Sequence, residues 1–196
     1  SISRSRRRDA NGGRGLNQKD ERSLMSNMDE VASLLNDMVA AGVIDDYAVF
    51  GAVAQMRYTE AVATLDADIL VVVPDEQALD VLSPIYTFCR EQGCQAEGEA
   101  IRVGDWPVQI IPAFDALTEA AVKDAETGEV DGVPLRVVGA DYLAVIALGV
   151  GRAKDFARIL ALRECKAVTD QRIAELADQY NLGEAWRSFL VRFDEK

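Results

Sequence analysis

The chain has 196 residues, 49% of them hydrophobic, which is enough to bury a full core as one domain or as one domain with a helical extension. No stretch approaches the roughly 18 consecutive apolar residues of a membrane-spanning helix, so we expect a cytoplasmic protein that does not enter the membrane. The sequence contains no histidine and three cysteines, which excludes Ser/His and Cys/His catalytic pairs and a Cys/His zinc site. Any chemistry must therefore use carboxylates, lysine and a metal ion.

Charge is distributed unevenly along the chain. Residues 1–24 hold seven Lys or Arg and three acids without periodic apolar positions, which predicts a disordered basic arm. The other residues, 25–196, hold 14 bases and 30 acids. Such an acidic body repels a polyphosphate backbone, so extended duplex DNA is not the expected partner. A nucleoside triphosphate delivered with a divalent cation remains compatible.

The first half of the chain changes its apolar period from helical to extended. Four apolar residues at i, i+3, i+4 and i+7 predict a helix from Met28 that Gly42 closes: Val31, Leu34, Leu35 and Met38. Residues 47–50 form a short apolar run that predicts a buried strand, and residues 52–58 predict a short helix directly after it. Residues 69–73, stopped by Pro74, form a β-branched run typical of a central strand.

The second half predicts hairpins followed by helices. One amphipathic helix uses Leu79, Leu82, Ile85, Tyr86 and Cys89 and ends at Gly93, with Cys89 interpreted as a small buried hydrophobe. Residues 95–103 and 108–111 predict an antiparallel hairpin, residues 117–122 a short helix, and residues 129–138 a smaller hairpin. Helical stripes cover residues 142–150, 153–166, 170–180 and 184–193. This order predicts an α+β core over residues 25–139 and a C-terminal helical subdomain over residues 140–196.

Two features in this order carry chemistry: a Gly51-Ala52 turn between a strand and a helix, and an Asp66-x-Asp68 pair that enters the next strand. Side chains at i and i+2 of a strand share a face, so Asp66 and Asp68 would direct two carboxylates to one point. Like charges this close repel unless a cation lies between them, and Mg²⁺ is the natural cation for hard oxygen ligands. Gly51 would let a phosphate approach the backbone N–H of Ala52.

This stretch resembles the signature of the DNA polymerase β-type nucleotidyltransferase superfamily, in which Gly is followed by Ser or Gly and, after a gap, by acid-x-acid on a strand. Residues 63–71 are most similar to the bacterial toxin-like and minimal members. Residues 143–148 with 151–155 resemble a helical segment of abortive-infection toxins, which implies that Lys154 and Asp155 face the nucleotide. The resemblance implies a mixed sheet flanked by helices, magnesium at Asp66 and Asp68, and a nucleoside triphosphate at Gly51, Ala52, Lys154 and Asp155.

The sequence also departs from this pattern. Ala52 stands where Ser or Gly is usual, and Gln109 stands where a third acid is common; Glu97 or Glu99 could replace that acid. A neutral amide cannot act as a general base. One function is therefore metal-dependent transfer of a nucleoside monophosphate to a hydroxyl on protein, RNA or a small molecule. The others are a catalytically silent binding or regulatory module, and a toxin-like component that acts with a protein partner.

Each feature also has a purely structural interpretation. The Asp66/Asp68 pair is compatible with a solvated strand edge, and Asp155 suits the first turn of a helix. A dense basic zone would grip a triphosphate if several of its members point at Asp66, and would otherwise balance the acidic surface. Its members are Arg152, Lys154, Arg158, Arg163 and Lys166.

Overall fold

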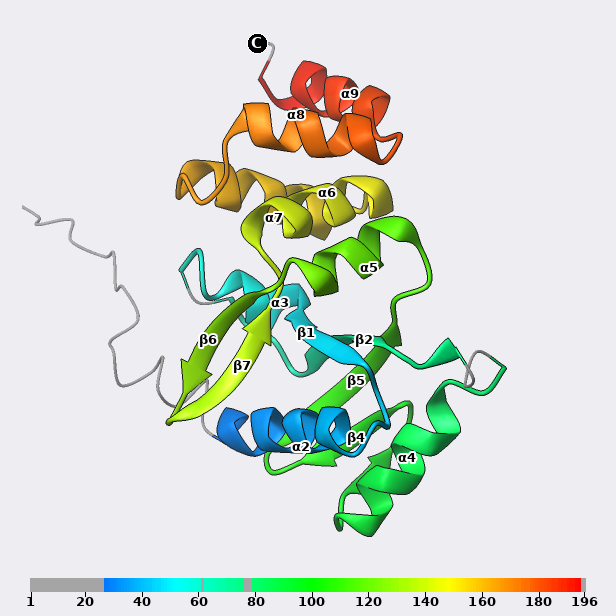
Figure 1. Cartoon of the computed structure of the whole chain (residues 1–196). Helices are drawn as coiled ribbons and strands as arrows, with labels where there is room; N and C mark the ends of the chain where they lie inside the picture. Colours follow the sequence, from blue (N-terminus) through cyan, green and yellow to red (C-terminus); the bar gives the residue numbers. More distant parts are fainter. Residues whose placement is uncertain (1–26, 61, 76–78, 195–196) are drawn as a thin grey trace, which may run out of the picture.

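A computed structural model describes residues 27–60, 62–75 and 79–194 of the chain, and within them a single mixed sheet carries helices on both faces (Figure 1). The fold is therefore α+β, as the sequence predicts. The predicted arm over residues 1–24 lies outside the described residues. Within the described part, no helix combines the length and the apolar character that crossing a lipid bilayer requires.

The strands form one seven-stranded sheet in the order β3-β4-β5-β2-β1-β7-β6. Their bounds are β1 Asp46–Phe50, β2 Ala67–Val72, β3 Gln95–Glu97, β4 Ala100–Val103, β5 Trp106–Pro112, β6 Glu126–Val130 and β7 Val133–Val137. The helices are α2 Met28–Ala40, α3 Gly51–Gln55, α4 Leu82–Glu91, α5 Ala116–Lys123, α6 Ala140–Val150, α7 Ala153–Glu164, α8 Asp170–Gln179 and α9 Gly183–Phe193.

The centre of the sheet aligns three strands at the same level. β1 pairs antiparallel with β2, which places Phe50 opposite Asp68. β2 pairs parallel with β5, which places Asp68 opposite Gln109. Paired residues share a face, so the side chains of Phe50, Asp68 and Gln109 form one row across the sheet.

The two faces of the sheet are covered by different helices (Figure 1). α2 covers the face that carries Tyr47, whose hydroxyl donates a hydrogen bond to Asn36 Oδ1 at 2.8 Å. α5 and α6 cover the face of the Asp68 row, and α7, α8 and α9 continue the helical layer away from the sheet. Eight of the eleven α6 residues are buried, which explains why this segment is apolar on all sides.

Most predicted elements are confirmed, and two need correction. Residues 95–103 form two strands instead of one arm, because Gly98 has a φ of +62° and turns the chain between β3 and β4. Leu79 lies outside α4 and is fully exposed. Helix α4 begins later, where Asp80 Oδ1 accepts a hydrogen bond from the Ser83 backbone and Pro84 fits the first turn.

The predicted boundary at residues 139 and 140 falls at the start of α6. Buried hydrophobic residues form one cluster from α2 to α9, so the sheet and the C-terminal helices share a core. The division into a core and a helical subdomain stays a prediction.

Candidate functional site

Gly51 and Asp68 are in direct contact at the point where β1 ends and α3 begins. Gly51 has a φ of +63°, which glycine adopts more easily than any other residue. A Cβ atom at this position would overlap Oδ2 of Asp68 and lie 3.2 Å from its Cγ. Glycine is thus required twice, by the backbone conformation and by the carboxylate above it. The glycine bend therefore lies beside Asp68, and the predicted roles of both residues stay predictions.

Asp66 lies just before β2 and is held by its own loop. The Thr64 hydroxyl donates to the Asp66 backbone oxygen at 2.9 Å, and its distance to Asp66 Oδ1 is 3.4 Å. Both Asp66 and Asp68 line a cleft of about 730 Å³, which we call the Asp68 cleft. It is lined by Ala52, Gln55, residues 62–66, Asp68, Lys154, Ala157 and Arg158. Thr64 was not predicted, although its position two residues before Asp66 is a local signal.

The electrostatics of the Asp68 cleft favour a bound cation. Burial and the neighbouring charge of Asp66 raise the pKa of Asp68, while Arg158, Lys154 and Arg152 act in the opposite direction. Among the described residues, the Asp68 carboxylate has no hydrogen bond and no ion pair within contact distance. A half-buried carboxylate beside a second one, without a direct partner, is a site that a cation would stabilise.

Helix α7 supplies the basic side of the cleft. The Arg158 side chain is 14% exposed, and its Nε donates to Gln55 Oε1 at 3.0 Å. Burial lowers the pKa of Arg158, and the nearby Asp155 and Asp68 oppose that shift. Lys154 lies one helical turn earlier and lines the same cleft. Gln55, buried four residues after Gly51, fixes the guanidinium and was not predicted from the sequence.

Asp155 has a different place from the one that the resemblance implies. Its side chain is 2% exposed and does not belong to the cleft lining. The carboxylate accepts hydrogen bonds from the Arg152 backbone at 3.2 Å and from Arg152 Nε at 2.7 Å, which caps the start of α7. Burial raises the pKa of Asp155, but these bonds outweigh it and hold the pKa below its ordinary value. Asp155 therefore caps the start of α7, as expected for an acid in the first turn of a helix, and does not line the Asp68 cleft.

No third carboxylate joins the pair from the neighbouring strands that the structure describes. Gln109 occupies the position opposite Asp68 on β5. Glu97 is on the edge strand β3, where it forms an ion pair with Arg102 at 2.6 Å, and Glu99 lies in the turn that follows. β4 and β5 separate β3 from β2, a span of about 14 Å at ordinary strand spacing. Neither glutamate can replace the missing acid in this arrangement.

The donor set can be compared with what a magnesium ion needs. Within the described residues, no group of three or more His, Cys, Asp or Glu side chains is arranged to hold a metal. Mg²⁺ is commonly held by one or two carboxylates together with substrate phosphates and water, instead of by a complete protein cage. Asp66 and Asp68 fit that mode, and Lys154 and Arg158 line the same cleft.

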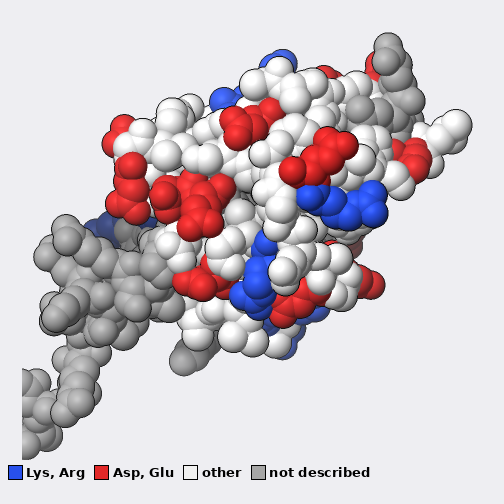
Figure 2. All heavy atoms as spheres, turned by 90° about the horizontal axis from the view of Figure 1, so that it is seen from below, with Lys and Arg blue, Asp and Glu red and all other residues white. Residues whose placement is uncertain are grey.

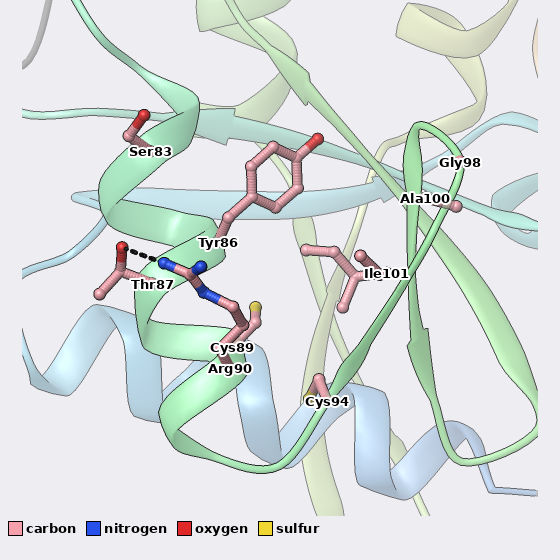
Figure 3. Close-up of a pocket in the computed structure, with 10 residues that line it drawn as sticks. Ser83, Tyr86, Thr87, Cys89, Arg90, Cys94, Gly98, Ala100 and Ile101 are labelled. Carbon is pink, nitrogen blue, oxygen red and sulfur yellow. Dashed lines mark hydrogen bonds between the residues drawn. The ribbon is translucent and has the colours of Figure 1, made fainter.

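A separate cavity of about 410 Å³ lies between α4 and the β3–β4 hairpin (Figure 3). Its lining includes Cys89 and Cys94 and none of the predicted site residues. Cys89 is buried as predicted, and burial raises the pKa of its thiol to about 12. A thiol in that state is protonated at neutral pH and is a poor nucleophile.

The face that carries α2 and α4 shows how the charges are distributed (Figure 2). Acidic groups form several separate clusters on this face, with smaller basic groups between them. No continuous basic stripe crosses the described residues in this view. The expectation about duplex DNA stays a prediction.

Comparisons with known proteins find likeness in structure only. No family model matches the sequence, and no curated protein matches it. An antigenic nucleotidyltransferase-like protein from Paracoccidioides brasiliensis is 13% identical, with a TM-score of 0.49, over 82% of this chain and 92% of that one.

Two structures of the antibiotic-resistance factor ANT(2″)-Ia are also similar in the path of the chain. Its solution structure is 14% identical with a TM-score of 0.43, over 85% of this chain and 98% of that one. Its crystal structure with adenylyl-2″-tobramycin is 11% identical with a TM-score of 0.44, over 86% and 99%. The function proposed below rests on the residues of the Asp68 cleft.

Proposed function

We propose that this protein is a metal-dependent nucleotidyltransferase that moves a nucleoside monophosphate from a nucleoside triphosphate to a hydroxyl acceptor. One observation carries the proposal. The half-buried Asp68 carboxylate has no direct partner among the described residues, yet it lies against Gly51 and shares a cleft with Asp66, Lys154 and Arg158.

The acidic residues of the cleft would bind a cation, and its basic residues would bind the phosphates. Asp66 and Asp68 would hold Mg²⁺, which supplies charge neutralisation and orientation of the triphosphate. Lys154 and Arg158 would neutralise phosphate oxygens, and Gln55 keeps the Arg158 guanidinium in place. No side-chain hydrogen bond caps the start of α3 and Ala52 lines the Asp68 cleft, so the Ala52 N–H would be the backbone donor to a phosphate bound there.

The proposed transfer balances as a displacement at the α-phosphorus. The acceptor oxygen forms a bond to this phosphorus while the bond to the oxygen that bridges the β-phosphate breaks. Pyrophosphate leaves with the electron pair of the broken bond. The hydroxyl proton passes to water, because the amide of Gln109, opposite Asp68, cannot accept it.

Label transfer tests this proposal directly. The full chain is incubated with Mg²⁺ and α-labelled nucleoside triphosphates, with the protein itself, RNA and small alcohols as acceptors. We expect labelled acceptor and pyrophosphate from the native protein and none from Asp66→Ala/Asp68→Ala. Glu97→Ala/Glu99→Ala is the matched control, because it removes two exposed acids at the same spacing. Equal transfer by both double variants would contradict the proposal.

A catalytically silent binding module is the second candidate, and Gln109 favours it. Such a protein binds a magnesium–triphosphate complex at Asp66 and Asp68 without forming labelled acceptor. The same experiment separates the two when nucleotide binding is measured beside transfer. The toxin-like form of the proposal adds a protein partner, which would become the labelled acceptor when supplied.

A further inference from the structure

A second cleft, similar in size to the Asp68 cleft, lies on the same face of the sheet. It has a volume of about 750 Å³ and lies between the sheet, α5, the end of α6 and the turn between α8 and α9. We call it the apolar cleft. Phe50, Leu70 and Ile111 form its floor, and Phe114, Val150 and Leu182 are among its walls.

Strand register places the two clefts next to each other. Phe50, which belongs to this floor, is opposite Asp68, so its ring and the carboxylate are neighbours on one face of the sheet. Leu70 and Ile111 are opposite each other, one step further along the same face from Asp68 and Gln109. A ligand resting on these three side chains would have Asp68 at its edge.

The chain also connects the walls of the two clefts. Val150 ends α6 at the rim of the apolar cleft, and α7 begins three residues later, next to Lys154 of the Asp68 cleft. Gly149 in the wall has Leu182 Cδ1 only 3.4 Å from where its Cβ would lie. Gly149 and Leu182 therefore bring the end of α6 and the turn before α9 together in this wall.

The lining of the apolar cleft selects against charged ligands. It contains no Lys or Arg, and its one acid, Asp115, already accepts a hydrogen bond from the Thr118 backbone at 2.7 Å. A phosphate group would therefore have no cationic side chain to bind in the apolar cleft, whereas Lys154 and Arg158 line the Asp68 cleft. The charge of the lining side chains thus favours the triphosphate in the Asp68 cleft and an uncharged ligand in the apolar cleft.

Uncovered apolar side chains at the rim indicate a ligand with a ring or hydrocarbon body. Phe114 is 82% exposed and Val150 is 52% exposed, although both belong to the lining. Aromatic faces stack on planar rings, and apolar clefts with few polar groups are typical of small-molecule sites. Tyr180 and Asn181 are the lining residues from the turn between α8 and α9 that carry polar side-chain groups.

We propose that the apolar cleft binds the acceptor, and that this acceptor is a small, neutral aromatic hydroxyl compound. The inference rests on the proposed function. Gln109 decides between a phenol and an aliphatic alcohol. With Asp66 and Asp68 engaged on the cation and an amide at Gln109, no carboxylate is left as a base, and the hydroxyl must lose its proton to water. A phenol, with a pKa of about 10, loses it far more easily than an aliphatic alcohol does.

Binding of 2-naphthol, followed by its own fluorescence, tests the location. Val150→Glu places a carboxylate at the rim, and we expect it to weaken binding at least about tenfold. Val191→Glu is the matched control: this valine is 56% exposed, also lies in the last turn of a helix and is outside the cleft. Unchanged binding in Val150→Glu, or equal losses in both variants, would overturn the proposal.

Removing the exposed ring is a second, milder change. Phe114→Ala should weaken 2-naphthol binding about three- to tenfold, and Leu79→Ala, a fully exposed control outside the cleft, should leave it unchanged. Charge selection is read from competition: 4-ethylphenol should displace 2-naphthol, and tyramine, which adds an ammonium group to a similar ring, should not. Displacement by both compounds at similar concentrations would contradict a neutral acceptor.

The failure of this inference can be told apart from the failure of the proposed function. Binding of a magnesium–α,β-methylene nucleoside triphosphate complex is measured with the same variants, and Val150→Glu should leave it unchanged. If the nucleotide binds but 2-naphthol binding ignores Val150→Glu, only the acceptor assignment falls. If the nucleotide does not bind the native protein, the proposed function falls and takes the acceptor role with it. Labelled 2-naphthol formed with release of pyrophosphate supports both.

Discussion

Helix α7 carries two arginines that meet aspartates in opposite ways. Arg163 forms ion pairs with Asp170 at 2.7 Å and Asp194 at 2.6 Å, and its guanidinium lies 5.6 Å from the centre of the Trp186 ring. Arg158, five residues earlier, donates to Gln55 and leaves Asp68 without a direct contact. Arg163 is in direct contact with both of its aspartates, whereas Arg158 pairs with Asp155 at 3.9 Å and only shares a cleft with Asp66 and Asp68.

The difference separates a structural cluster from a binding site. Around Arg163, each charge is satisfied within the chain, which ties α7 to α8 and to the end of α9. In the Asp68 cleft, two acids and two bases face a common space without neutralising one another. Charges held apart in this way interact strongly with whatever enters between them.

The largest expected difference between the Asp68 cleft and the Arg163 cluster appears when one carboxylate is removed from each. Asp68→Asn should lower label transfer more than about a hundredfold, because a group that holds the cation contributes at least as much as its supporting neighbours. Asp170→Asn should leave transfer near the native level, since it lies in the Arg163 cluster. Comparable losses in both variants would erase the distinction.

Substitution of Gly51 tests the contact between the backbone turn at Gly51 and the Asp68 carboxylate. Gly51→Ala should lower the free energy of unfolding by about 1–3 kcal/mol more than Gly42→Ala does. Both glycines have positive φ, +63° and +70°, but only Gly51 faces Asp68, and Gly42 has nothing within 4 Å of the added atom. Urea unfolding of both variants measures the difference, and equal losses would mean that the contact is unimportant.

Substituting each of the two arginines should affect the free energy of unfolding and the nucleotide affinity differently. Arg163→Gln removes an ion-pair network and should cost about 1–2 kcal/mol of unfolding free energy without affecting nucleotide affinity. Arg158→Gln should cost about 1 kcal/mol, because the buried Gln55 oxygen loses its donor, and should also weaken nucleotide binding about tenfold. Thermal unfolding and calorimetric binding on the same samples distinguish the two patterns. Weakened nucleotide binding in Arg163→Gln would count against the assignment.

The smallest expected effect is in the pH dependence of stability. The pKa of Asp68 is raised in the folded protein, so the folded state holds this proton more tightly than the unfolded chain does. The stabilisation is therefore present below the unfolded pKa and is lost as the pH rises toward the folded pKa.

At neutral pH the charged Asp68 then destabilises the fold. Asp68→Asn should raise the free energy of unfolding at pH 7 without magnesium, and the gain should disappear at low pH. Urea unfolding at a series of pH values measures it. A variant that is less stable than the native protein at pH 7 would contradict this electrostatic account.

Local patterns in the sequence predict the part of the site that is local in the chain. Gly51, Asp66 and Asp68 lie within one strand–helix–strand segment, and alternation along β2 fixes the face of Asp68. The partners on α7 are far away in the sequence, and the rotation of that helix is set by its packing on α6 and by the hydrogen bond from Arg158 to Gln55. Sequence alone could name Arg158 and Arg163 as basic residues but could not tell which of them faces Asp68.

The corrections have the same origin. The glycine turn that divides residues 95–103 depends on a positive φ at Gly98, which period-two patterning does not reveal. Asp155 fits both a helix cap and a nucleotide pocket by residue type, and only the three bonds from Arg152 decide between them.

Calorimetric titration with a magnesium–α,β-methylene nucleoside triphosphate complex tests the central claim most directly. The native protein should bind it only in the presence of magnesium, Asp66→Asn/Asp68→Asn should not bind it, and Glu97→Gln/Glu99→Gln should bind it as the native protein does. Binding that persists in the Asp66/Asp68 variant, or that needs no metal, would contradict the claim that these two carboxylates hold a cation for the phosphates.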